Sequence, residues 1–204
     1  MRVNKKKFIY LISPNKIYKK FFKDLQKVLE TGKINFFQLR LKKYSFKHKI
    51  LIGKKIKNIC KENNVKFLIN DDPILAKRLC ADGCHLGQKD VNIKEARKII
   101  GKKIIGITCH NSITLAKIAI KAKASYLAFG AFYSSKTKKT KYAANIKILN
   151  KIKKITKTPI VAIGGINSEN YKNLLLNNAN FLAISGYIWN NKKLKPQQAI
   201  KNLI

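Results

Sequence analysis

Short apolar runs alternate along the whole chain with longer segments in which apolar residues recur every three or four positions. The runs have the length of strands and the segments have the periodicity of helices. The predicted strands are residues 8–12, 36–39, 67–69, 83–86, 104–107, 126–129, 159–163 and 181–184. The predicted helices are 17–29, 46–60, 73–79, 93–100, 112–122, 146–155 and 169–176, and a final helix closes the chain.

Eight strand–helix pairs with strands this apolar predict a parallel sheet whose two faces are both covered. Eight is also the number of units in a (β/α)8 TIM barrel, and 204 residues is near the short limit for that fold. No Pro-, Gly- or Ser-rich linker interrupts the chain, so we expect one α/β domain over residues 1–204. An open, doubly wound sheet is the alternative, because counting strands does not prove closure.

In a barrel the reactive groups lie at the carboxyl ends of the strands, and polar or glycine residues follow the predicted strands of this chain at those positions. They are Gln38, Arg40 and Lys42; Asn70 and Asp71; Asp90; Thr108; Ser135, Thr137 and Lys138; Gly164 and Gly165; and Ser185 and Gly186. The sequence therefore predicts that these residues gather at one end of the barrel.

The segment from Gln38 to Lys42 alternates polar and apolar residues, which puts Gln38, Arg40 and Lys42 on one face of an extended chain. A guanidinium and an ammonium group together suit a diphosphate, and an amide is suited to a heterocycle. The alternative is the polar side of an edge strand, but a closed barrel has no edge.

Two carboxylates follow neighbouring predicted strands, Asp71 after the third and Asp90 in the turn after the fourth. Adjacent strands lie about 4.8 Å apart, so both side chains are able to reach one ion. Magnesium takes one or two protein carboxylates and completes its shell with water and phosphate oxygens. We therefore predict a Mg²⁺ site at Asp71 and Asp90. Asp72, just before a proline, is instead predicted to cap a helix. Helix capping is also the alternative role for Asp90, although Asn92 is able to cap the same helix.

The loop after the sixth strand combines hydroxyl groups, backbone N–H groups and lysines, from Ser134 to Lys138. Such a segment suits a flap that closes over an anion, although a solvated charge run would look similar. Gly164-Gly165 and Ser185-Gly186 fit the phosphate site that many barrels build after their last two strands. His85 and His110 are expected to be hydrogen-bonded structural residues.

The formal charge of +36 points to polyanion binding, but the lysines are scattered over every predicted helix. A nucleic-acid surface would gather basic residues and interleave aromatic ones, so we expect solvated lysine faces. The four cysteines have neither CxxC nor zinc spacing and are expected to be reduced and buried, as in a cytoplasmic protein. The first apolar run is too short for a signal peptide, and no segment reaches the length of a membrane span.

Seven motifs together resemble thiamine phosphate synthases, in order from about residue 8 to residue 189. They are QLRLK, LINDDP, ADGCHLGQKD, IGITCHN, KTKK, AIGGI and AISG. The resemblance implies a TIM-barrel transferase of thiamine biosynthesis that couples a pyrimidine diphosphate to a thiazole phosphate with Mg²⁺ and releases pyrophosphate.

The resemblance also implies roles for individual residues. Gln38, Arg40, Lys42 and Asn70 match residues that hold the pyrimidine diphosphate, and Asp71 and Asp90 match the magnesium ligands. Thr108 matches a serine near the pyrimidine, and Lys138 matches a lysine that binds pyrophosphate. The residues that match contacts to the thiazole phosphate are Ser135, Lys136, Thr137, Gly165, Ile184 and Ser185.

Three positions depart from the family pattern. Ser134-Ser135 replaces the usual Pro-Thr, Thr108 replaces serine, and Lys136 adds charge at a variable position. None of the three removes a hydrogen-bond donor, so we expect an active enzyme that uses a dissociative mechanism.

Two other functions are weighed against this one. A thiazole tautomerase or inactive relative on the same barrel would not need the diphosphate and metal residues that this chain retains. A basic nucleic-acid-binding protein has only the net charge in its favour. The sequence leaves the oligomeric state open.

Overall fold

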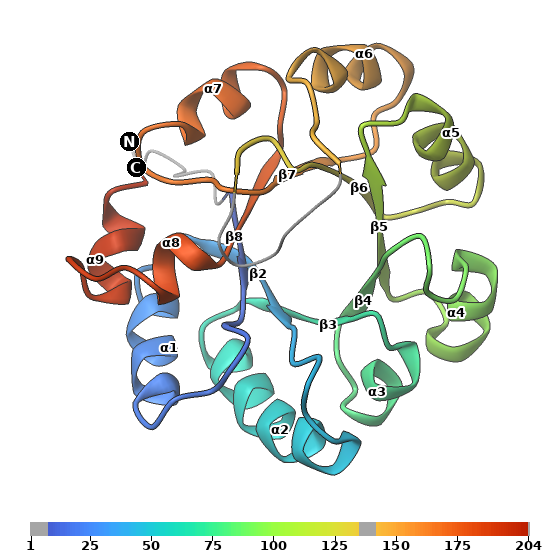
Figure 1. The fold of residues 1–204 in the computed structure, drawn as a ribbon. Coiled ribbons are helices and arrows are strands. Elements are labelled where there is room, and N and C mark those ends of the chain that lie inside the picture. The colour runs from blue at the N-terminus through green and yellow to red at the C-terminus, as the bar shows by residue number, and fades with distance from the viewer. Residues whose placement is uncertain (1–7, 135–141, 204) are drawn as a thin grey trace, which may run out of the picture.

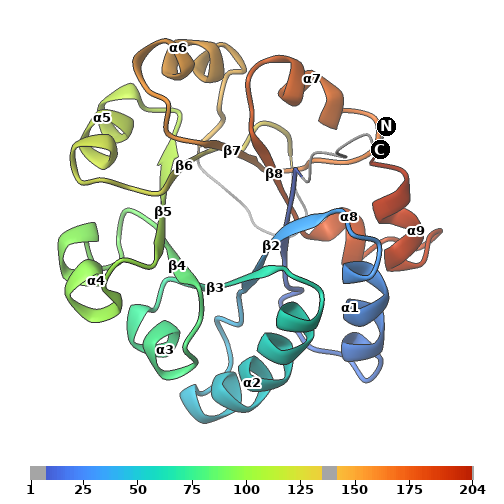
Figure 2. The same cartoon turned by 180° about the vertical axis from the view of Figure 1, so that it is seen from behind.

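The computed structural model describes residues 8–134 and 142–203, which form a closed barrel of parallel strands surrounded by helices. Neighbouring strands pair in chain order from β1 to β8, and β8 closes the ring on β1, with Ile9 opposite Leu182 (Figures 1 and 2). The strands are β1 (Ile9–Ile12), β2 (Ile34–Leu39), β3 (Lys66–Asn70), β4 (Gly83–Leu86), β5 (Ile104–His110), β6 (Tyr126–Phe129), β7 (Ile160–Ile163) and β8 (Phe181–Ile184). The predicted TIM barrel is confirmed, and the open-sheet alternative is wrong.

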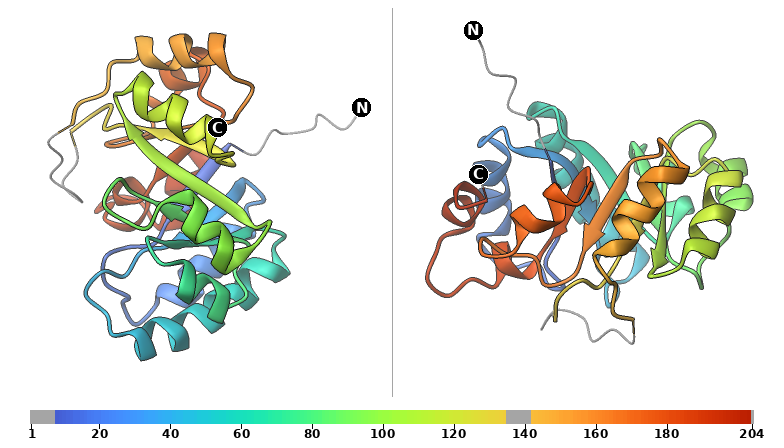
Figure 3. Two further views of the ribbon diagram at one scale, coloured as in Figure 1. Left: turned by 90° about the vertical axis from the view of Figure 1, so that its right-hand side faces the viewer. Right: turned by 90° about the horizontal axis from the view of Figure 1, so that it is seen from above.

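The helices follow the strands in alternation and lie outside the barrel, as the side views in Figure 3 show. They are α1 (Phe21–Leu29), α2 (Phe46–Glu62), α3 (Pro73–Arg78), α4 (Ile93–Ile100), α5 (Ile113–Lys121), α6 (Lys147–Ile155), α7 (Tyr171–Leu176), α8 (Gly186–Trp189) and α9 (Pro196–Lys201). Among the described residues, none of these helices is both long and apolar enough to cross a bilayer.

Alternate residues of each strand point to two separate cores. Ile9 and Leu11 of β1 pack outward against the helices, whereas Tyr10 and Ile12 point into the barrel. The inner core also holds Tyr126, and aromatic rings fill part of it: Tyr10 lies 5.7 Å from Tyr126, centroid to centroid. Because the interior is packed with side chains, ligand access is limited to the ends of the barrel.

The structure differs from the predicted elements where tertiary pairing decides the boundary. Strand β5 runs past Thr108 to His110, with a register shift against β6, so Thr108 lies within the strand and not at its end. Residues 17–20 precede α1 rather than belonging to it, and the predicted final helix is two helices, α8 and α9. Cys60, Cys84 and Cys109 are buried free thiols, but Cys80 is exposed, which corrects the prediction for that residue.

Asp72 caps α3 as predicted: its Oδ1 accepts a hydrogen bond from the Leu75 N–H at 2.8 Å. Asn92 caps α4 through the Glu95 N–H at 2.9 Å, which leaves Asp90 for another role. For α7, Asn167 accepts from the N–H groups of Glu169 and Asn170 in the turn before the helix.

We expect Asp72→Ala to lower the free energy of unfolding by about 1 kcal/mol, because the Leu75 N–H loses its acceptor. Urea denaturation measures the change. Asp72→Asn retains an acceptor oxygen and is the matched control. Equal stability of the Ala and Asn variants would contradict the capping role.

Candidate functional site

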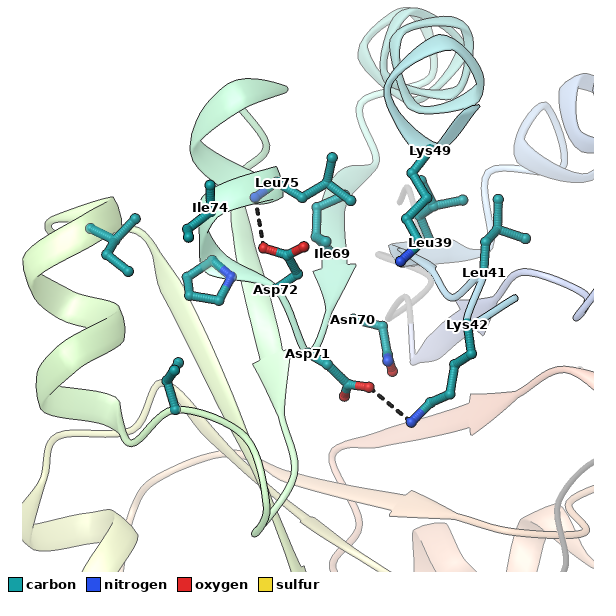
Figure 4. A pocket seen from close by; sticks show the side chains of 13 residues that line it. Leu39, Leu41, Lys42, Lys49, Ile69, Asn70, Asp71, Asp72, Ile74 and Leu75 are labelled. Carbon is teal, nitrogen blue, oxygen red and sulfur yellow. Dashed lines mark hydrogen bonds and ion pairs between the residues drawn. The ribbon is translucent and has the colours of Figure 1, made fainter. Parts of the chain in front are cut away.

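The predicted diphosphate and metal residues meet at the carboxyl ends of β2, β3 and β4. The Lys42 Nζ lies 2.9 Å from Asp71 Oδ2, and Figure 4 shows Lys42 and Asp71 pointing toward one another with Asn70 beside them. A pocket of about 440 Å³ opens next to this ion pair; it is lined on one side by Leu39, Leu41 and Ile69, which point outward from the sheet. Polar and apolar residues of the Gln38–Lys42 segment therefore lie on opposite sides, as the alternation predicts.

Asp71 has a left-handed backbone, with φ of 64°, and its N–H donates to the carbonyl of His85 on the neighbouring strand at 2.8 Å. Asp90 is held by its own turn: its Oδ2 accepts from the Gly87 N–H at 2.7 Å. The two carboxyl groups lie close enough for each to shift the pKa of the other. The two neighbouring strand ends thus bring both carboxyl groups to one point, as predicted.

The pKa values of the two carboxyl groups move in opposite directions. Burial opposes ionisation of Asp71, but its contacts with Lys42 and Asp90 and the charge of Lys42 outweigh the effect of burial, so the Asp71 pKa is lowered. Burial and the adjacent Asp71 raise the pKa of Asp90, although its bond from the Gly87 N–H opposes the rise. Two carboxylates this close repel each other unless a proton or a cation lies between them.

These donors suit magnesium. Within the described part of the chain, no group of three or more His, Cys, Asp or Glu side chains is placed to hold a metal ion. Two carboxylates at an open strand end fit the general donor pattern of Mg²⁺, which takes few protein ligands and fills its other positions with water and phosphate oxygens.

Arg40 is fixed in front of this pair by residues that follow β1. The Arg40 guanidinium donates to Asn15 Oδ1 at 2.7 Å, and the backbone N–H of Arg40 donates to Ser13 Oγ at 2.9 Å. Partial burial lowers the pKa of Arg40 and the charge of Asp71 opposes that shift; the guanidinium stays protonated. The mouth therefore presents two cations, Arg40 and Lys42, beside two carboxyl groups.

Gln38, Asn70 and Thr108 form the polar floor of the mouth. Gln38 is buried, and its Nε2 donates to Asn70 Oδ1 at 2.5 Å. The Thr108 hydroxyl lies 2.9 Å from His85 Nε2. His85 is thus hydrogen-bonded inside the barrel, as expected, while His110 stacks on Tyr142 at 3.9 Å between centroids.

The loop after β6 is attached to the glycine pair after β7. The Phe132 N–H donates to the Ile163 carbonyl and the Tyr133 N–H to the Gly164 carbonyl, both at 3.1 Å. Gly165 has φ of 62°, and a Cβ there would overlap the Ser134 carbonyl, so only glycine allows this approach. The predicted flap residues Ser135, Lys136, Thr137 and Lys138 lie outside the described residues.

Comparison with known proteins decides the family. The family model described as thiamine monophosphate synthase matches residues 9–188. The chain belongs to the thiamine monophosphate synthase family. It is therefore a transferase of thiamine phosphate synthesis, as the motifs predict.

Individual relatives agree with the family model. The thiamine-phosphate synthase of Pelagibacter ubique is 66% identical over 206 residues and both chains are covered completely. That of Erythrobacter litoralis is 39% identical, with 96% of this chain and 94% of the relative covered. Among solved structures, the thiamine phosphate pyrophosphorylase of Pyrococcus furiosus superposes with a TM-score of 0.86 at 27% identity, covering 98% of this chain and 94% of that one.

Family membership directs attention to the end of β8, where two predicted residues lie. The Ser185 hydroxyl donates to the Ser13 carbonyl at 3.1 Å. The side chain of Ile184 is buried in the outer core, so only its backbone is available to a ligand. The structure thus brings Ser185 to the mouth but turns the Ile184 side chain away from it.

Sequence reasoning missed several residues that shape this family site. Ser13 follows β1 and connects the ends of β1, β2 and β8 through its backbone and hydroxyl; the strand-end rule would have found it. The Gln88 amide donates to the Thr108 carbonyl. Tyr10 and Tyr126 appear only as apolar positions within strands, and nothing in the pattern distinguishes them from core residues.

Proposed function

We propose that the chain joins 4-amino-2-methyl-5-hydroxymethylpyrimidine diphosphate to hydroxyethylthiazole phosphate at this barrel mouth, in a Mg²⁺-dependent reaction. The observation that carries the proposal is the Asp71–Asp90 pair beside Lys42 and Arg40, in a chain that belongs to this family. Both acidic metal donors and basic phosphate donors are needed when the leaving group is a diphosphate.

The pyrimidine diphosphate occupies the side of the mouth formed by β2 to β5. Gln38, Asn70 and Thr108 face its ring with amide and hydroxyl groups, and Arg40 and Lys42 bind its phosphates. The fixed position of Gln38 supports this assignment, because the buried amide is held by hydrogen bonds to Tyr10 and Asn70.

Asp71 and Asp90 hold the magnesium ion, which lowers the cost of charge on the diphosphate when it is bound. Arg40 and Lys42 bind the departing pyrophosphate, and Lys138 from the flap adds a further positive charge. In the reaction the carbon–oxygen bond between the pyrimidine methylene and the diphosphate breaks, and its electron pair leaves with pyrophosphate. The electron-rich aminopyrimidine stabilises the resulting cation, and the thiazole nitrogen donates its lone pair to form the new carbon–nitrogen bond.

The thiazole phosphate lies on the opposite side of the mouth, against the β6, β7 and β8 loops. Ser135, Lys136, Thr137, Gly165, Ser185 and the backbone of Ile184 supply its phosphate contacts. The close approach of Gly165 to Ser134 supports this arrangement, because it joins the start of the flap to the glycine turn.

We expect Gly165→Ala to raise the KM for the thiazole phosphate by about tenfold. The added Cβ displaces the Ser134 carbonyl, and the phosphate then loses contacts with the glycine turn and the loop after β6. Gly101→Ala is the matched control. Gly101 has the same φ of 62° but open space around it, so it reports the cost of the left-handed backbone alone. Equal KM values in the two variants would contradict a role for the Gly165 turn in binding.

Two tests separate this proposal from its rivals. A thiazole tautomerase isomerises the thiazole phosphate without any pyrimidine substrate, which is followed by NMR. A nucleic-acid-binding protein binds generic duplex below micromolar concentration at physiological salt, tighter than ordinary non-specific binding. We expect neither activity.

The metal requirement and the dissociative step are tested together. Pyrophosphate release should stop on chelation and return with added Mg²⁺. The ¹⁸O label is placed in the oxygen that joins the pyrimidine methylene to the first phosphorus of the diphosphate. If a cation forms before the thiazole attacks, this label should move into the non-bridging oxygens of that phosphate group. Full turnover in excess chelator would overturn the metal assignment, and retention of the label would contradict the dissociative mechanism.

We also propose that the enzyme is cytoplasmic. Small phosphorylated substrates and four free cysteines support this location. We expect the enzyme to act as a single domain over residues 1–204, without a specific nucleic-acid or membrane partner.

A further inference from the structure

A continuous chain of side-chain hydrogen bonds crosses the barrel interior beneath the mouth. It runs from the Thr108 hydroxyl to His85 Nε2 at 2.9 Å and from His85 Nδ1 to the Tyr126 hydroxyl at 2.9 Å. It continues from Tyr126 to the Tyr10 hydroxyl at 2.8 Å and from Tyr10 to Gln38 Oε1 at 2.7 Å. The chain thus connects Thr108 on β5 with Gln38 on β2.

The contacts of Gln38 set the direction of the bonds from Gln38 as far as His85 Nδ1, and a neutral imidazole then sets the direction of the bond to Thr108. Gln38 Nε2 donates to Asn70 Oδ1, so the other amide atom, Oε1, is an acceptor and takes the single proton of Tyr10. The Tyr10 oxygen then accepts from Tyr126 in their shared bond.

The direction of the two bonds at His85 follows from the proton of Tyr126. The only proton of Tyr126 is directed to Tyr10, so Tyr126 accepts from His85 Nδ1–H. In the neutral imidazole, Nε2 is then the acceptor, and the Thr108 hydroxyl donates its proton to it.

We propose that Tyr10, Tyr126 and His85 are positioning residues: their one-directional hydrogen-bond chain sets which groups Thr108, Gln38 and Asn70 present to the pyrimidine ring. With its proton directed to His85, the Thr108 oxygen faces the mouth as an acceptor. With its Oδ1 occupied by Gln38, Asn70 faces the mouth with its NH₂ donor. This inference rests on the proposed assignment of these three residues to the pyrimidine.

Three features of the structure indicate that these side chains serve to fix the direction of the hydrogen bonds and not only to fill the core. Tyr10 and Tyr126 are 1% and 2% exposed, so water does not compete for their hydroxyl groups. Burial raises the pKa of both phenols far above the ordinary value for tyrosine, so each hydroxyl keeps the single proton that it donates along the chain of hydrogen bonds.

The third feature is Gly106 on β5. A Cβ at this position would overlap the Tyr126 ring, so the glycine provides the space in which the phenol reaches both Tyr10 and His85. The IGIT motif thus contributes both an end of the chain, Thr108, and the gap that the chain passes through.

The direct test is the tautomer of His85 in the ligand-free protein, measured by ¹⁵N NMR at about pH 8, above the ordinary pKa of histidine. The protein contains three histidines, so the spectrum of the His85→Gln variant is used to assign the His85 signals: they are the ones that it lacks. We expect protonated Nδ1 and unprotonated Nε2. The opposite tautomer, a mixture of the two, or a ring protonated on both nitrogens overturns the proposal.

A kinetic test uses Tyr126→Phe, which removes one oxygen and keeps the ring. Without the Tyr126 acceptor, His85 is expected to shift toward the Nε2–H tautomer and to release the Thr108 proton. The KM for the pyrimidine diphosphate should rise about tenfold, while the KM for the thiazole phosphate stays within about twofold.

Tyr171→Phe is the matched control, because Tyr171 is a buried tyrosine in the outer core, outside the chain. An unchanged His85 tautomer in Tyr126→Phe, or equal effects on both KM values, overturns the proposal. Since the NMR measurement needs no substrate, it judges the hydrogen-bond chain even if the proposed coupling activity fails.

Discussion

Asp71→Asn is expected to reduce coupling at saturating substrates and ordinary Mg²⁺ by about 100-fold or more, and to raise the Mg²⁺ concentration for half-maximal rate by at least about tenfold. The substitution removes one of the two anionic metal donors and the partner of Lys42 at 2.9 Å. Asparagine is the informative choice because Asp71 has φ of 64°. Asn adopts that left-handed backbone readily, whereas alanine would add strain.

Steady-state pyrophosphate release as a function of Mg²⁺ measures both effects. Glu62→Ala is the control, since Glu62 is an exposed carboxylate at the end of α2, away from the mouth. Thermal unfolding should show both variants folded. A fully active Asp71→Asn enzyme with unchanged Mg²⁺ dependence would refute the metal site.

Arg40→Ala should lower kcat/KM for the pyrimidine diphosphate by about 100- to 1,000-fold, because it removes a cation that stabilises charge on the departing pyrophosphate. Asn15 and Ser13 hold this guanidinium in place, so little reorganisation is needed when the diphosphate binds. Arg40→Lys should restore only part of the loss, since an ammonium group cannot make the bidentate contact of a guanidinium.

The effect of Arg40→Ala is measured by varying each substrate in turn. Arg78→Ala removes an exposed arginine of α3 and should leave both kinetic constants near those of the wild type. A loss in Arg40→Ala that falls only on the thiazole phosphate would contradict its assignment to the diphosphate.

The barrel was predictable because its strands are short apolar runs with regular spacing, and the polar residues at their ends mark the mouth. Strand β4, Gly83–Leu86, and helix α4, Ile93–Ile100, have the predicted bounds. The predicted boundaries were wrong where contacts between distant segments determine them. Strand β5 continues to His110 because it pairs with β6, and no local sequence pattern indicates that pairing.

The site was predictable to the extent that its chemistry lies at strand ends. Asp71 and Asp90 were found because carboxylates are rare in this chain, which has 9 acidic residues against 45 Lys and Arg. Tyr10 and Tyr126 were missed because an inward tyrosine and an inward phenylalanine have the same periodicity. Only the structure shows that their hydroxyl groups meet.

The most direct test of the account is to incubate the protein with pyrimidine diphosphate, thiazole phosphate and Mg²⁺, and to quantify thiamine phosphate and pyrophosphate. We predict that both products form in equal amounts and that neither forms when one substrate or the metal is omitted. Absence of thiamine phosphate from the complete mixture, or isomerisation of the thiazole phosphate as the sole reaction, would contradict it.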